Sequence, residues 1–476
     1  MLGIFGTLGL ASRSLSAYQT GAEVTGHNLA NVHNPAYARQ RIELQTSTTV
    51  SSELGPQGTG VEVVVIRQLR DALLDRQIQS ETSVRGWLEA QQQTLQYAQA
   101  GLGQSIDRQA TGIDGTAASG AMGGQTGLAE GLSGLFNAWQ SLSANPASST
   151  ERQLLVNQAQ NLATQFNQTS GRLSQLNTAS NDRLVQDTGS LNRLIADIAQ
   201  LNGRIVTAEV GGNGVANDLR DLRLQRMEDL ARLVQFTAVP LDSGAVDLVI
   251  DGQSMTSSAL VIDTLETYDP GNGQLLLRTR TAGTPVQLTG GAIQGTIDVR
   301  DGALASLRGD LDLLAATLIA EVNARHTPAF DLQGNSGQPF FDGTDASSFR
   351  VHDGVAADPS RVQAAAAPGA PGDNRAALSL AQLRGTPLAA LGNQTFQGHF
   401  GQTVARLGQS LASTNLQLDN QAVVEGMLQR QRESVSGVSL DEEMASLILF
   451  QRAFQASARL ISTLDEMLVT VVTLGT

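Results

Sequence analysis

The chain has 476 residues, enough for about three domains, and only 4% of them are aromatic, so large compact cores are not expected. It has no cysteine and all 31 of its basic residues are arginine, which excludes disulfides, thiolate ligands, a P-loop lysine and a lysine Schiff base. The net charge of −14 argues against nucleic-acid binding. No apolar run approaches the roughly 18 residues that cross a membrane, so no membrane partner is expected.

The first 35 residues predict one long helix followed by a turn. Its apolar positions alternate in steps of four and three, the seam pattern of a coiled coil. They are Ile4, Leu8, Ala11, Leu15, Tyr18, Ala22, Thr25 and Leu29. Asn34-Pro35 ends the pattern, because the residue before a proline is disfavoured in a helix. The first basic residue, Arg13, follows the apolar start, whereas a secretory signal peptide has the reverse order.

The next two hundred residues read mainly as helices. The stretch 36–67 loses the helical period and predicts an extended hairpin or long loop. Helices are expected at about 69–100, 128–142, 151–207 and 217–234, and 101–127 is expected to be a flexible connection rich in Gly, Ser and Ala. The helix at 151–207 would be roughly 85 Å long, and a rod of that length favours a scaffold.

From 236 to 299 the pattern changes to short strands separated by Gly, Asp and Pro turns, including one at 293–299, which predicts a small all-β insert. A helix follows from Leu304 to Val322, and 326–395 is expected to be a loop-rich excursion. A long helix then begins near Phe400, with Gln421 and Glu425 as polar positions in its apolar seam.

The last helix begins after Ser436-Gly437, where Ser439 and Glu442 form a capping-box pattern. Its apolar stripe comprises Leu447, Phe450, Phe454, Ile461, Leu464, Leu468 and Val471. Two apolar helices therefore bracket the chain, and each lacks a partner. The simplest closure pairs them, with the middle segments projecting outward.

Candidate chemistry is sparse. None of the five histidines lies at HExxH or HxxxH spacing, and no serine lies in a Gly-x-Ser-x-Gly elbow. Asp331, Asn335 and Asp342 lack the spacing of a calcium loop, so a solvated loop is favoured. We expect no catalytic residue, no cofactor and no metal site.

Several segments together resemble a known family. Residues 26–40, GHNLANVHNPAYARQ, resemble the N-terminal signature of flagellar axial proteins, in which an Asn-Ile-Ala-Asn core leads into Asn-Thr-Pro-Gly-Tyr. Residues 436–468 are similar to the closing helix of those proteins. Arg39-Gln40 and the segments 135–167, 217–234 and 321–341 resemble the branch found at the hook–filament junction. Ala36 stands where the family usually has Gly, which disfavours a type II turn and leaves the turn type open.

The resemblance implies an α+β protein, mainly α with a β insert, in three parts. Residues 1–35 and 437–476 would pair as a coiled-coil inner domain lining the flagellar channel. Residues 36–235 and 300–436 would form a long-helix middle domain, with the excursion at 326–395, and 236–299 a small all-β outer domain.

The expected function is structural. The chain would form a layer between hook and filament by self-assembly of subunits into a ring or helix. The partners implied are further copies of the chain, the flagellar hook protein, hook-associated protein 3 and a cytoplasmic export chaperone. The chain would be secreted through flagellar type III export and located in the extracellular flagellum.

The residues expected at the assembly interface come from both ends of the chain. On the N-terminal side they are Ile4, Leu8, Leu15, Tyr18, Asn28, Asn31, Pro35, Tyr37, Arg39 and Gln40. On the C-terminal side they are Leu447, Phe450, Phe454, Ile461, Leu464 and Leu468.

Three alternatives remain at this point. Another axial component, such as a hook or distal rod protein, would share the two ends but not the middle segments. An enzyme such as a peptidoglycan hydrolase would need an acid in an aromatic-lined cleft, for which two Trp and four Tyr offer little material. A cytosolic coiled-coil adaptor is the third.

Overall fold

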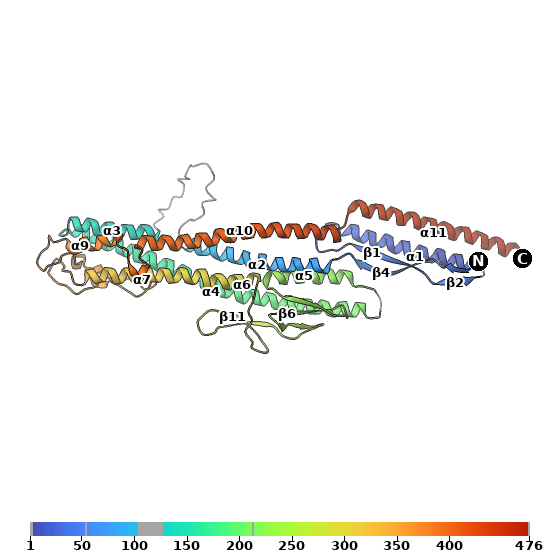
Figure 1. The fold of residues 1–476 in the computed structure, drawn as a ribbon, viewed down its shortest axis with the longest axis horizontal. Coiled ribbons are helices and arrows are strands. Elements are labelled where there is room, and N and C mark those ends of the chain that lie inside the picture. The colour runs from blue at the N-terminus through green and yellow to red at the C-terminus, as the bar shows by residue number, and fades with distance from the viewer. Residues whose placement is uncertain (1–2, 53–54, 103–126, 212–213, 475–476) are drawn as a thin grey trace.

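The computed structural model describes residues 3–52, 55–102, 127–211 and 214–474. The molecule is a long rod of helices, and both chain ends lie at the same end of it (Figure 1). The helices are α1 (Ile4–Ala30), α2 (Ala72–Gly101), α3 (Leu128–Ala144), α4 (Ser149–Glu209), α5 (Asn217–Leu233), α6 (Gly291–Val299), α7 (Ala305–His326), α8 (Asp353–Ala357), α9 (Arg375–Gln382), α10 (Phe396–Ser436) and α11 (Leu440–Leu474). In the part of the chain that the structure describes, no helix has both the length and the apolar composition needed to span a membrane.

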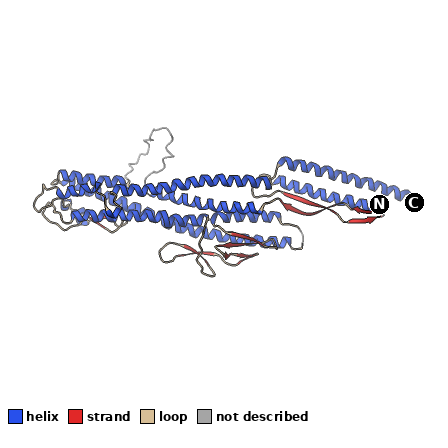
Figure 2. Cartoon of the chain, in the orientation of Figure 1, coloured by secondary structure: helices blue, strands red, loops and turns tan. Residues whose placement is uncertain are grey.

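The strands form small antiparallel sheets along the rod (Figure 2). They are β1 (Gln40–Thr46), β2 (Thr49–Ser52), β3 (Gly55–Gly58), β4 (Val61–Gln68), β5 (Thr237–Pro240), β6 (Val246–Ile250), β7 (Gln253–Ser254), β8 (Thr256–Ser257), β9 (Leu260–Val261), β10 (Leu265–Tyr268), β11 (Leu276–Thr279), β12 (Phe341–Asp342) and β13 (Arg350–Val351). The pairs are β1–β4, β2–β3, β5–β6–β7, β8–β9, β10–β11 and β12–β13. The mainly helical architecture with small sheets is therefore confirmed.

The long helix α4 forms the backbone of the rod. Its 61 residues span about 90 Å at 1.5 Å per residue. The predicted stripe is buried along most of this length, from Leu155 and Leu162 to Ile198 and Ile205. Its first half packs into one apolar core with α3, α7, α9 and α10, and its second half into another core with α5, α6 and the strands β6, β10 and β11. One helix thus connects two cores.

The segment 326–395 is not a loose excursion. Phe340, Phe341 and Phe349 are fully buried in the core at the tip of the rod, beside Trp139 and His326. The segment has few regular elements because it closes the end of a helical bundle, where chain must cross between helices. The sequence indicated the turns but not this packing.

One predicted strand is wrong, because residues 293–299 form helix α6. Their apolar residues alternate as in a strand, but a short run of this kind does not distinguish strand from helix. Packing against α2 decides, since Gly295 lies so close to α2 that a Cβ there would be 2.3 Å from the carbonyl oxygen of Trp87. The insert is therefore not all-β at its C-terminal end, and it shares its core with α4 and α5.

Other predictions are confirmed at the level of elements. The hairpin at 36–67 forms as β1 and β4, with an irregular register between Glu43 and Leu44. Gln421 and Glu425 are buried polar seam residues, bonded to Glu81 and Arg85 of α2. The predicted connection at 101–127 lies largely outside the described residues.

The two terminal helices lie side by side, apart from the main bundle (Figure 1). The hairpin β1–β4 covers another side of α1. In α1 the most buried positions are small or polar residues, including Ala17, Gly21 and Asn28, whereas the predicted seam residues Ile4, Leu8, Leu15 and Tyr18 are only half-buried. The aromatic ring of Phe450 fills the space beside Gly21, and a Cβ at that position would lie only 2.7 Å from a ring carbon. The helices therefore approach closely over α1's small side chains.

Candidate functional site

The joint between the terminal helices and the bundle consists of two chain crossings. The first runs from the end of α1 to β1, and the second from α10 to α11 through residues 437–439. The crossings touch directly, because the backbone N–H of Arg39 donates to the carbonyl oxygen of Ser436 at 2.9 Å. Any motion of the terminal helices relative to the bundle must act on this region.

Asn28 is the centre of the joint. It is 1% exposed, and its amide makes four hydrogen bonds. Its Nδ2 donates to the carbonyl oxygen of Gln40 and to the carboxylate of Glu443, both at 2.9 Å. Its Oδ1 accepts from the backbone N–H of Gln40 at 2.9 Å and from the hydroxyl of Tyr37 at 2.8 Å. One side chain thus links α1, the first crossing, β1 and α11.

Arg39 adds a double ion pair to the same contact. Its Nη1 lies 2.6 Å from a carboxylate oxygen of Glu442, and its Nε lies 2.7 Å from one of Glu443. Glu443 is 2% exposed, so its charge depends on Arg39 and Asn28 for compensation. The sequence predicts Glu442 as part of a capping box, but in the structure its carboxylate accepts from Arg39, so this side chain anchors α11 to the first crossing.

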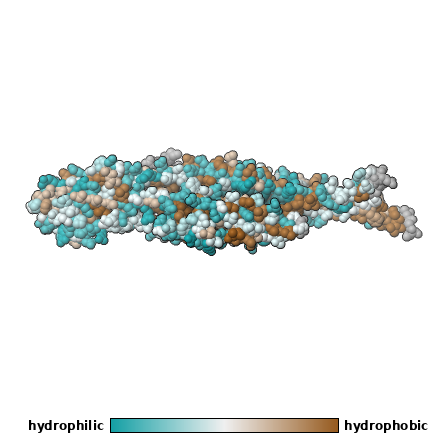
Figure 3. All heavy atoms as spheres, turned by 60° about the horizontal axis from the view of Figure 1, so that its bottom comes forward, coloured by the Kyte–Doolittle hydropathy of each residue, from teal (hydrophilic) through white to brown (hydrophobic). Residues whose placement is uncertain are grey.

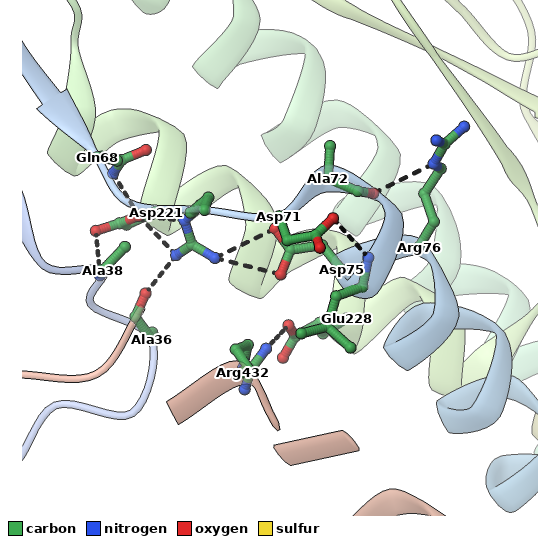
Figure 4. A network of polar contacts seen from close by, with 12 residues as sticks. Ala36, Ala38, Gln68, Asp71, Ala72, Asp75, Arg76, Asp221, Glu228 and Arg432 are labelled. Atoms are coloured by element: carbon green, nitrogen blue, oxygen red, sulfur yellow. Dashed lines mark hydrogen bonds and ion pairs between the residues drawn. The ribbon is translucent and has the colours of Figure 1, made fainter. Parts of the chain in front are cut away.

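The first crossing is also bonded to the bundle, as Figure 4 shows. The carboxylate of Asp221 on α5 accepts from the backbone N–H of Ala38 at 3.1 Å and from Nη2 of Arg70 at 2.7 Å. The same Arg70 nitrogen donates to the carbonyl oxygen of Ala36 at 2.9 Å. Burial raises the pKa of Asp221, and the Arg70 guanidinium opposes that rise. The α1–β1 connection is therefore held by α5 as well as by α11.

Three acidic side chains gather here around two arginines. Arg70 pairs with Asp221 and, at 3.5 Å, with Asp75 of α2, while Glu228 of α5 pairs with Arg432 of α10 (Figure 4). Burial raises the pKa of Asp75 and of Glu228, again against the neighbouring arginines. This network joins α2, α5 and α10 directly beneath the joint.

Tyr37 lies within this polar region with its ring edge-on to His27, at 5.4 Å between centroids. Its hydroxyl donates to Asn28. Burial, and then the carboxylates of Asp218, Asp221 and Glu443, raise the pKa of Tyr37 above its usual range. The hydroxyl therefore keeps its proton and remains a donor at every physiological pH.

The structure settles the turn left open by Ala36. The carbonyl oxygen of Asn34 accepts from the N–H of Tyr37 at 3.1 Å, and the Asn34 side chain accepts from the N–H of Ala36 at 3.2 Å. Ala36 is not among the described residues with positive φ. The turn is therefore of type I, with Pro35 at its second position and no residue in a left-handed conformation. Alanine at position 36 is accommodated without strain.

The predicted interface residues separate into two groups. Asn28, Tyr37, Arg39 and Gln40 meet in the joint, whereas Pro35 is exposed beside it. On α11, Leu464 is buried and Leu447, Phe450, Ile461 and Leu468 are half-buried, so these side chains face α1 of the same chain. Phe454 lies at the border of this face, at 37% exposure. Asn31 caps the end of α1, with its side chain donating to the carbonyl oxygen of His27.

Further large apolar residues of α11 lie on both flanks of the stripe that packs against α1, and α1 does not cover them. Except for Val471, which belongs to the predicted stripe, this exposed set was missed from the sequence because its spacing is irregular. Its members are Leu440, Met444, Ile448, Leu449, Leu460, Met467, Val469, Val471 and Val472, all exposed, with Leu449 at 66%. We call these residues the outer face of α11. Monomeric proteins rarely expose so many large apolar side chains along one helix, and such surfaces mark sites of association.

Asp221, Arg70 and Glu443 were also missed by the sequence reading. No spacing in the sequence marks them, since charged residues such as Asp221 and Arg223 are normally exposed, yet both are buried here. For chemistry, the described residues hold no group of three His, Asp or Glu side chains arranged to bind a metal ion. The joint is a set of hydrogen bonds and ion pairs that links the terminal helices to the bundle.

Comparisons with known proteins agree with this architecture. The family model of the flagellar hook-associated protein FlgK helical domain matches residues 120–341, and that of the flagellar basal body rod FlgEFG protein C-terminal region matches 429–474. Flagellar hook-associated protein 1 of Bacillus subtilis is 25% identical, over 98% of both chains. The chain is thus similar to flagellar hook-associated protein 1 along nearly its whole length.

Other relatives are less similar in sequence. Flagellar hook-associated protein 1 of Salmonella typhimurium is 22% identical, over 96% of this chain and 97% of its own. The structure of the flagellar hook junction protein FlgK from Burkholderia pseudomallei superposes with a TM-score of 0.64 at 15% identity, covering 76% of this chain and all of that one. That likeness shows the fold.

Proposed function

We propose that this chain forms the layer between the hook and the filament of a bacterial flagellum, by helical self-assembly through its paired terminal helices. The similarity to flagellar hook-associated protein 1 supports the location. The observation that carries the mechanism is the outer face of α11, because α1 covers only one side of that helix.

The energetic argument is direct. Apolar surface gains about 25 cal/mol for each Å² removed from water. Fully burying side chains of this kind contributes roughly 1.5–3 kcal/mol each, so a row of them favours association strongly when subunits pack side by side. Neighbours in a ring or helical array meet through different surfaces, and an α1–α11 pair with apolar side chains left open fits such a heterologous contact.

The domain arrangement follows from this proposal. Residues 1–35 and 437–476 would form the inner, channel-lining part as a coiled coil. The helical bundle, from 36–235 and 300–436, would lie further out, and the insert at 236–299 would lie outermost. The joint at Asn28, Arg39 and Glu443 would then transmit load between the inner pair and the bundle.

The proposed partners are further copies of this chain, the flagellar hook protein on one side and hook-associated protein 3 on the other. Export would proceed through the flagellar type III pathway, with a cytoplasmic chaperone holding the exposed terminal helices until then. The role is structural, without catalysis.

A matched pair of variants tests the assembly mechanism. Leu449→Asp places a charge on the outer face of α11, and Gln455→Asp places the same charge at an exposed polar position of the same helix. We expect the first chain to fold and be exported but to be absent from the junction, so that filaments do not grow. The second should support normal filaments.

A third variant separates contacts within the chain from contacts between chains. Leu464 is buried against α1, so Leu464→Asp should disrupt the helix pair itself and change the circular dichroism of the purified chain. Leu449→Asp should leave that spectrum unchanged. Normal filament growth with Leu449→Asp would refute the proposed use of the outer face.

A further inference from the structure

The insert carries an exposed apolar ridge, formed by Leu260, Val261 and Ile262. Leu260 is 68% exposed and the other two are also open to solvent. Single exposed apolar residues are ordinary, but three in succession on an ordered hairpin are not. Strand alternation places Leu260 and Ile262 on the same side.

The ridge is held rigidly. Strand β9 pairs with β8, and the N–H of Ile262 donates to the carbonyl oxygen of Met255 at 2.8 Å. The hairpin turn is fixed to α4, because Nδ2 of Asn202 donates to the carbonyl oxygen of Ser258 at 2.9 Å. A rigid apolar projection loses little conformational entropy when it docks.

The chain also carries an open apolar groove of about 510 Å³ between the start of α2, helix α5 and strand β5. Leu224 and Met227 of α5 and Pro240 of β5 provide apolar lining, and Arg67 and Arg76 stand at its edge. Figure 3 colours each residue by hydropathy and shows hydrophobic residues gathered on the rod near the terminal helices. The hydrogen bond of the Arg76 guanidinium goes to the carbonyl oxygen of Ala72 in its own helix (Figure 4).

We propose that the ridge of one copy docks in the groove of a neighbouring copy. Charge favours this occupant. Two chains of net charge −14 repel on average, so they approach best where basic groups of one meet acidic groups of the other. The groove offers Arg76, whereas Arg67 is already paired with Glu43 at 3.1 Å, and the ridge is followed directly by Asp263.

The shapes also suit a second copy. A contact between different surfaces of identical subunits requires a projection and a recess on the same chain, and both are present here. The inference rests on the proposed assembly role and adds a second contact, on the insert, to the one made by the terminal helices.

Cross-linking in assembled flagella tests the contact. The chain has no cysteine, so engineered thiols report on chosen positions only. Cells would express two chains together, one with Leu260→Cys in the ridge and one with Leu224→Cys in the groove. Two separate chains exclude a cross-link within one molecule.

We expect covalent dimers, after a short bismaleimide, at least ten-fold above those of a control pair of Leu260→Cys with Leu154→Cys. Leu154 is an exposed residue in the first turns of α4. Neither single-cysteine chain alone should give them.

Three outcomes are distinguishable. Dimers confined to the ridge–groove pair support the proposal. Flagella that contain both chains, shown by antibody labelling, without such dimers overturn it while leaving the assembly role intact. If flagella from cells that express the wild-type chain do not contain that chain, the assembly role is contradicted, and with it this contact.

Discussion

Acidification should loosen the tip of the rod through His326. This side chain is fully buried beside Trp139 and Phe340. Its Nδ1 lies 2.9 Å from the carbonyl oxygen of Gln338, which can only accept, so Nδ1 carries the proton. Its Nε2 accepts from the backbone N–H of Gln363 at 2.9 Å. A second proton on Nε2 would oppose that N–H.

The magnitude follows from the pKa. Burial lowers the pKa of His326 from 6.5 to about 4. The unfolded chain therefore binds this proton more readily than the folded one, so the stabilisation is complete above pH 6.5 and is lost as the pH falls toward 4. The full loss is about 3 kcal/mol, and about 2 kcal/mol is already lost between pH 7.5 and pH 5.

The assay is urea unfolding at pH 7.5 and pH 5, followed by the fluorescence of Trp139 in a Trp87→Phe background, so that the signal comes from the tip alone. As the pH is lowered from 7.5 to 5, the free energy of unfolding of the wild-type chain should decrease through His326. In His326→Gln the total stability should be lower at pH 7.5, but its change with pH should be smaller by about 2 kcal/mol.

Comparing variants removes the contribution of other groups. Asp75, Asp221 and Glu228 have raised pKa values, so their protonation favours the folded state as the pH falls, which is the opposite sign. His33→Gln, at an exposed position, serves as the control and should keep the wild-type pH dependence. An unchanged pH dependence in His326→Gln would refute the assignment.

Three further predictions concern the terminal helices. Asn28→Ala leaves the buried Glu443 and Tyr37 short of partners, so it should weaken the attachment of the terminal helices to the bundle by about 2–4 kcal/mol. Asn31→Ala should have little effect, and hydrogen exchange of α11 would measure both variants. Gly21→Leu should destabilise the α1–α11 pair by roughly 1–3 kcal/mol and so lower the melting temperature. Gly26→Ala, whose added Cβ meets no neighbour, should raise the melting temperature. Limited proteolysis of the monomer should trim both ends to a core near 40–430, because the α1–α11 pair leaves large apolar side chains exposed and opens readily without neighbouring subunits. Resistant ends would count against assembly-coupled ordering.

Periodicity predicted the helices well because apolar stripes determine which face is buried. The stripe of α4 and the polar seam residues Gln421 and Glu425 are where the spacing placed them. Helix α6 was read as a strand, since nine residues carry too short a period to decide and the contact of Gly295 with α2 is non-local.

The joint illustrates what spacing alone does not reveal. Asn28, Tyr37 and Arg39 were identified through their resemblance to a family signature, but Glu443 lies 415 residues from its partner Asn28. Asp221, which accepts from the backbone N–H of Ala38, lies 183 residues from it. Buried polar networks of this kind are set by tertiary packing and leave no periodic trace. The outer face of α11 was hidden for a different reason, because apolar residues on both flanks of the buried stripe blur the spacing of that stripe.

A side-chain-resolution image reconstruction of the native hook–filament boundary tests the central proposal most directly. We predict that this chain forms the layer between hook and filament, with α1 and α11 nearest the channel and Leu449 buried against the next subunit. A layer in which the outer face of α11 remains open to solvent, or a boundary without this chain, would contradict the account.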